Sequence, residues 1–142
     1  MLYGKILVPV DGSENSYAAL KEAIKVAKLS DGKITVIHVY LKWSTIHADS
    51  RDALHEVLED QAKSVLENAE KIAYAENFKI KTQLLEGDIV QQIVKTADAE
   101  GFDLIVMGAR GVGKLTELLL GSVSSGVLKN ASCPVLITKE KG

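Results

Sequence analysis

The stretch Asp103-Leu104-Ile105-Val106-Met107-Gly108-Ala109-Arg110-Gly111 joins an apolar run to a loop that contains glycine. The run from Leu104 to Met107 has no polar residue, which is typical of a strand buried on both faces of a parallel sheet. Residues 112–120 then lead to Gly121-Ser122-Val123-Ser124. The sequence therefore predicts a loop at the carboxyl end of a buried strand.

The glycines of this stretch, at positions 108, 111 and 121, favour a ligand site. A residue without a Cβ lets the backbone approach a ligand closely, and it can also adopt a positive φ. Residues 123–128 predict a short helix, and the first N–H groups of a helix have no partner within it. Those donors and the positive end of the helix dipole favour an anion. We therefore expect a phosphate group to bind here.

Two better-known phosphate-binding motifs do not fit the same residues. The spacing from Gly108 to Gly113-Lys114 matches the P-loop pattern GxxxxGK[ST], but Leu115 stands where a Mg²⁺-binding hydroxyl is required. Gly111-Val112-Gly113 opens a GxGxxG pattern, but Thr116 replaces the third glycine. No βαβ unit of adequate length follows that pattern. Both motifs are rejected.

The rest of the chain alternates predicted strands with predicted helices. Continuous apolar runs predict buried strands, whereas the alternation of polar and apolar residues over 78–85 predicts a half-exposed edge strand. Apolar residues at three- and four-residue steps predict the helices. The predicted strands are residues 5–10, 34–40, 78–85, 103–107 and 134–138, and the predicted helices are residues 13–30, 50–74, 88–101 and 123–128. This order predicts one α/β domain over residues 1–142, a three-layer sandwich with a five-stranded parallel sheet.

Composition narrows the classes of partner. A net charge of -2 and a pI near 5.9 give no broad basic surface, so we expect no nucleic-acid partner. No apolar run approaches the ~20 residues that span a bilayer, and Met1 leads straight into a strand, so we expect a cytoplasmic protein without membrane contact. The single cysteine, Cys133, has no disulfide or zinc partner, and a packing role is expected.

Gly108-x-x-Gly111, nine residues, then Gly121-Ser122 resembles the nucleotide-binding signature of the universal stress protein family, in the subgroup that binds ATP. Ile6-Leu7-Val8-Pro9-Val10-Asp11-Gly12-Ser13 resembles the opening of that family and Cys133-Pro134-Val135-Leu136-Ile137 its closing strand, so the resemblance covers essentially the whole chain. It implies an adenine nucleotide alpha hydrolase-like fold with strand order 3-2-1-4-5. The strands ending at Asp11 and Gly108 would then flank the topological switch, where ligands bind.

The resemblance also implies the ligand and its contacts. The ligand would be ATP or another adenine nucleotide, with Mg²⁺ or Mn²⁺ carried on the phosphates. Asp11 would contact a ribose hydroxyl or the metal, and the backbone of Val39 would meet the adenine. The expected binding residues are Pro9, Val10, Asp11, Val39, Met107, Gly108, Arg110, Gly111, Gly121, Ser122, Val123 and Ser124.

Each of these assignments has an ordinary structural alternative. Asp11 also suits a turn or a helix cap, and Val39 also suits the core. Arg110 also suits an exposed loop, and the serines at 122 and 124 also suit helix capping. The three histidines have no metal-ligand spacing, and His38, which lies inside a predicted strand, is expected to be structural.

The expected function is a homodimeric, nucleotide-dependent switch or sensor in stress responses, acting on an unidentified protein partner. The strand over 134–138 would be an unprotected apolar edge, so we expect it to pair with a second copy, as it does in the family that this chain resembles. We find no Ser/His/Asp set or paired carboxylates for catalysis. The alternatives are slow ATP hydrolysis or autophosphorylation on a loop serine, and an interaction module that needs no nucleotide.

Overall fold

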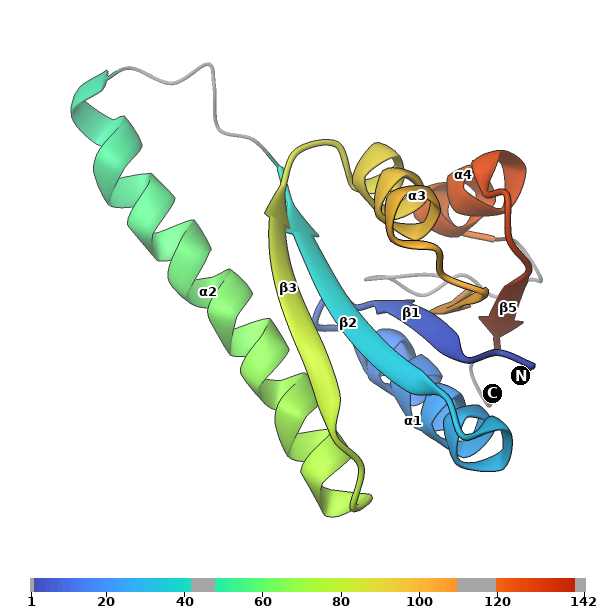
Figure 1. Cartoon of the computed structure of the whole chain (residues 1–142). Coiled ribbons are helices and arrows are strands. Elements are labelled where there is room, and N and C mark those ends of the chain that lie inside the picture. Colours follow the sequence, from blue (N-terminus) through green and yellow to red (C-terminus); the bar gives the residue numbers. More distant parts are fainter. Residues whose placement is uncertain (1, 42–47, 110–119, 140–142) are drawn as a thin grey trace.

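The computed structural model describes residues 2–41, 48–109 and 120–139 (Figure 1). Strands and helices alternate along these residues, as the sequence predicts. In chain order the elements are β1 (Lys5–Pro9), α1 (Glu14–Ser30), β2 (Lys33–Tyr40), α2 (Ala48–Ala75), β3 (Ile80–Glu86), α3 (Ile89–Glu100), β4 (Leu104–Gly108), α4 (Ser122–Asn130) and β5 (Val135–Thr138). The longest helix, α2, begins at Ala48, slightly before the helix predicted over residues 50–74.

The strands form one parallel sheet in the order β3-β2-β1-β4-β5, which confirms the α/β fold and the strand order. The predicted half-exposed strand, β3, lies at one edge, and β5 lies at the other. Figure 1 shows α1 and α2 on one side of the sheet and α3 and α4 on the other. The sheet is therefore the middle layer of three.

Two apolar clusters hold these layers together. One lies on the α1/α2 side and the other on the α3/α4 side, and β1 contributes to both because its side chains alternate between faces. Ile6 and Val8 point into the first cluster and Leu7 points into the second, and all three are fully buried. Burial on both faces explains why β4 and the part of β1 that follows Lys5 are apolar without interruption.

The helix boundaries follow local capping. Ser13 accepts a hydrogen bond from the N–H of Ser16 (3.2 Å) at the start of α1, and Asp88 accepts one from the N–H of Gln91 (2.9 Å) at the start of α3. At its other end, α3 closes on Gly101 in the left-handed conformation. Among the described residues, no helix is long and apolar enough to cross a bilayer.

The two helices of the α3/α4 layer meet at a glycine. A Cβ placed on Gly126 of α4 would lie 2.9 Å from Cγ2 of Val90 on α3, closer than a real Cβ contact. The glycine therefore lets the two helices pack closely.

Candidate functional site

The site is built at the carboxyl ends of β1 and β4, the central strands. These two strands pair directly, with Ile6 opposite Leu104 and Leu7 opposite Ile105. The chain leaves β1 toward β2 on one side, whereas β4 is followed by β5 on the other side. The connections therefore diverge between β1 and β4, which is the topological switch at which ligands of parallel α/β sheets bind.

The first turn of α4 presents main-chain donors to this place. Its N-cap is Gly121, which makes no side-chain capping bond, because glycine has no side chain to accept one. The N–H of Gly121 donates to the carbonyl of Ala109 at the end of β4 (2.7 Å). For the N–H groups of Ser122, Val123 and Ser124, the described ranges contain no acceptor. They lie at the helix start where the sequence predicts an anion site, a role that their position suits.

The hydroxyl of Ser124 has a different role from the one expected of it. Ser124 is 2 % exposed, and its Oγ lies 2.5 Å from the carbonyl oxygen of Ala109 and 3.2 Å from that of Gly121. Its single proton is therefore directed at the main chain, where it ties α4 to the end of β4. The N–H of Ser124 has no acceptor among the described residues, and Ser122 is exposed with no partner there for its N–H or its hydroxyl.

Neither of the two loop glycines that the structure describes uses the positive φ that glycine permits. Gly121 has a φ of -68° and a ψ of 169°, the extended conformation of an N-cap, and Gly108 is not among the glycines with positive φ. Gly108 meets a steric demand instead. A Cβ there would lie 3.1 Å from the carbonyl oxygen of Asn15 and 3.2 Å from its carbonyl carbon, because the start of α1 packs against β4.

Asp11 lies in the turn between β1 and α1. Its Oδ1 accepts a hydrogen bond from the N–H of Ser13 (2.9 Å), and its own N–H donates to Oγ of Ser16 (3.3 Å). Asp11 is a turn aspartate, as the structural alternative held, and its carboxylate is also exposed. A carboxylate offers about four acceptor positions, so the turn bond leaves capacity for a ligand. The positive φ that this turn requires is supplied by Gly12, at 88°.

Beyond Pro9, the pairing of β1 with β2 ends with a bond from a side chain in place of a main-chain bond. The N–H of Val10 donates to the carbonyl of Ile37 (2.8 Å), but the carbonyl of Val10 accepts from Nδ1 of His38 (2.7 Å). The main chain of Val39 therefore lies past the end of β1. The N–H of Val39 makes no bond to the carbonyl of Val10, the acceptor that a continued ladder would give it, although Val39 is only 6 % exposed. The sequence did not identify this contact of His38; its one signal is a polar residue inside an apolar strand.

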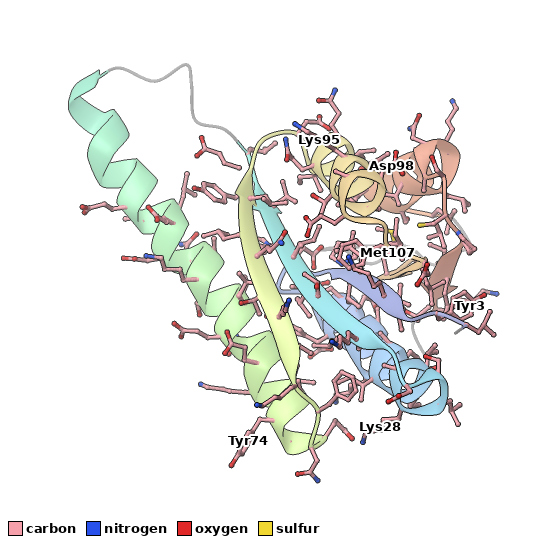
Figure 2. All side chains as sticks on the ribbon, in the orientation of Figure 1. Tyr3, Lys28, Tyr74, Lys95, Asp98 and Met107 are labelled. Atoms are coloured by element: carbon pink, nitrogen blue, oxygen red, sulfur yellow. The ribbon has the colours of Figure 1, made fainter. Side chains whose placement is uncertain are left out.

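Of the other residues expected to bind the nucleotide, Met107 and Pro9 are at least half-buried, and two lie outside the described ranges. Met107, labelled in Figure 2, is 5 % exposed and packs in the α3/α4-side cluster, so its side chain serves the core. Pro9 is half-buried at the end of β1, where the sequence places it. Arg110 and Gly111 lie outside the described ranges.

Burial raises the pKa of two side chains that pack near the sheet, Tyr17 and Cys133. Burial raises the pKa of the Tyr17 hydroxyl, an interaction with the Asn68 side chain opposes this, and the charge of Asp11 adds a smaller upward effect. The hydroxyl donates to the carbonyl of Val65 (3.0 Å). Burial also raises the pKa of the Cys133 thiol, as expected of a packing cysteine. No group of three or more metal-binding side chains occurs within residues 2–41, 56–109 and 120–139, for which side chains are described.

Comparison with known proteins identifies the group to which this chain is related. The model of the universal stress protein family matches residues 2–139. The chain belongs to the universal stress protein family. Among solved structures of similar proteins, protein MJ0577 of Methanocaldococcus jannaschii superimposes with a TM-score of 0.86 at 35% identity, covering 100% of this chain and 99% of that one.

Two further structures of universal stress proteins hold adenine nucleotides. One, in complex with cAMP, has a TM-score of 0.77 and 28% identity, covering 97% of this chain and 98% of that one. The other, from Archaeoglobus fulgidus in complex with dAMP, has a TM-score of 0.72 and 26% identity, covering 96% of this chain and 98% of that one. These two ligands share an adenine base and a phosphate group.

Proposed function

We propose that this universal stress protein binds ATP, or another adenine nucleotide, at the carboxyl ends of β1 and β4. The observation that carries the proposal is the set of N–H groups at Ser122, Val123 and Ser124, which have no acceptor in the described part of the chain. Main-chain donors at a helix N-terminus suit a phosphate, and the cAMP and dAMP complexes of related proteins support an adenine nucleotide as the class of ligand.

The residues present fit each part of such a ligand. The N-terminus of α4 would hold phosphate oxygens through its free N–H groups. The main chain of Val39 would hydrogen-bond the edge of the adenine base, which offers both donors and acceptors. The exposed carboxylate of Asp11 would accept a hydrogen bond from a ribose hydroxyl. A divalent cation, Mg²⁺ or Mn²⁺, would come with the phosphates and neutralise part of their charge.

Titration calorimetry tests the binding directly. We expect saturable binding of ATP with Mg²⁺ present, approaching one nucleotide per chain, and weaker binding of GTP because its base presents different hydrogen-bonding groups at Val39. Inorganic triphosphate serves as the control for the phosphate site alone. If ATP at millimolar concentration produced no binding heat and no rise in melting temperature, the proposal would be overturned.

The proposed physiological role is a nucleotide-dependent switch or sensor that acts as a homodimer. The support for the dimer is β5, which pairs only with β4 in the described sheet and leaves Leu136 39 % exposed at the edge. An apolar strand with an open edge favours pairing with another strand. A second copy would cover this edge symmetrically.

Sedimentation at micromolar concentration measures this assembly. We expect a species of twice the 15.3 kDa chain mass, because pairing of two β5 edges buries Leu136 in both copies. Leu136→Lys places a charge at that edge and should shift the equilibrium to the monomer. Lys139→Ala, a change at an exposed residue just after β5, is the control and should leave the mass unchanged. A wild-type chain that sediments only as a monomer would refute the dimer.

A further inference from the structure

We propose that His38 is a positioning residue for the nucleotide site, because its imidazole holds the Val10 carbonyl away from the main chain of Val39 and so keeps that main chain available to the ligand. The inference rests on the proposed function, since it concerns how the same site is prepared for the adenine base. It starts from one hydrogen bond, between Nδ1 of His38 and the carbonyl oxygen of Val10 (2.7 Å), which joins residues 28 apart in the sequence.

The register of the sheet shows what this bond replaces. Strand β1 pairs with β2 from Lys5 opposite Lys33 to Pro9 opposite Ile37, so a continued register would place Val10 opposite His38. In a parallel pair, a residue donates to the residue before its partner and accepts from the residue after it. Val10 makes the first bond, to the carbonyl of Ile37. The second bond would come from the N–H of Val39, and the side chain of His38 takes its place.

The alternation of main-chain groups along β2 gives the direction in which Val39 faces. The carbonyl of Ile37 points toward β1, where it accepts from Val10, whereas the carbonyl of Tyr40 points toward β3, where it accepts from Gly87 (2.9 Å). Val39 is two residues from Ile37, so its N–H and carbonyl face the β1 side. Because β1 has already ended there, these groups face the proposed ligand rather than another strand.

The chemistry of the bond assigns the proton on His38. The carbonyl oxygen of Val10 can only accept, so Nδ1 must carry the hydrogen, and in the neutral ring Nε2 is then the acceptor. The same peptide unit is held from its other end, since the N–H of Asp11 donates to Oγ of Ser16 (3.3 Å). The peptide that joins Val10 to Asp11 is therefore held by two side chains, those of His38 and Ser16.

Two substitutions separate this role from simple packing. His38→Leu fills similar space without a donor, so the Val10 carbonyl should return to the N–H of Val39, and ATP should bind about tenfold more weakly. His38→Asn places an amide N–H near the position of Nδ1 and should restore binding to within about threefold of wild type. Titration calorimetry measures both affinities, and thermal unfolding shows whether the variants are folded.

Amide hydrogen exchange, followed by NMR, reports the backbone change itself. In the wild-type chain without nucleotide, the N–H of Val39 should exchange faster than that of Ile37, which lies within the ladder, and ATP should slow it. In His38→Leu the same N–H should be protected without nucleotide. Equal protection of Val39 and Ile37 in the nucleotide-free wild type, or unchanged ATP affinity in His38→Leu, would overturn the role of His38. Should the wild type show the expected exchange pattern but no ATP binding, the proposed function alone fails.

Discussion

Replacing Ser122 with proline should weaken ATP binding by about 30-fold or more while leaving the fold intact, since a charge-assisted hydrogen bond contributes about 1.5–3 kcal/mol. Ser122 is the first residue of α4, a position at which proline is well tolerated because its N–H has no partner within the helix. The residue before it, Gly121, has the extended conformation that proline prefers in its predecessor (ψ 169°). The substitution therefore removes one main-chain donor from the proposed phosphate site. Titration calorimetry with ATP and Mg²⁺ measures the loss.

The matched control for this variant is Ser122→Ala, which removes the hydroxyl and keeps the N–H. If the main chain carries the interaction, the alanine variant should bind ATP within about threefold of wild type, because it keeps the N–H that would contact the phosphate. Thermal unfolding of both variants without ligand should give melting temperatures close to wild type. Equal loss of affinity in the two variants would assign the contact to the hydroxyl, and no loss in the proline variant would remove the N-terminus of α4 from the site.

Replacing Gly108 with valine should destabilise the nucleotide-free protein by about 3 kcal/mol, at the upper end of the range for overpacking a close contact. The Cβ would lie 3.1–3.2 Å from three atoms of Asn15, of which two belong to the main chain at the start of α1. Main-chain atoms in a capped helix turn cannot rotate away as a side chain can, so α1 must move as a body or β4 must bend. Urea unfolding followed by circular dichroism measures the change in the free energy of unfolding.

Two further variants test the cause of that destabilisation. Gly108→Ala adds the Cβ without the two methyl groups of valine and should cost about 1 kcal/mol. Asn15→Ala combined with Gly108→Val should remain as unstable as Gly108→Val alone, because the substitution leaves the carbonyl group and the Cβ of residue 15 in place. A full-stability valine variant with reduced ATP affinity would show that Gly108 serves the ligand and not the packing of α1.

The pattern of polar and apolar residues along the chain was sufficient to predict the strands and helices and their order in the sequence. The apolar run from Leu104 to Met107 predicted a strand buried on both faces, and the polar alternation over 78–85 predicted an edge strand; both predictions are confirmed. Capping by Ser13 and Asp88 also follows from the sequence, because a cap bonds only to residues two or three positions away. The N–H groups at the start of α4 that lack an acceptor among the described residues also follow from short-range information, because the first turn of a helix has no acceptors for them within the helix.

The tertiary structure decided which partners the site residues have. That Gly108 faces the main chain of Asn15, that the Ser124 hydroxyl bonds to Ala109, and that His38 bonds to Val10 are contacts between separate elements. The periodicity of apolar residues predicts which face of a helix or strand is buried. It does not predict which atoms of a neighbouring element that face will contact. The sequence by itself determined the sheet and the position of a helix start after Gly121, whereas only the folded chain decided which donors and acceptors there bond to one another within the described residues.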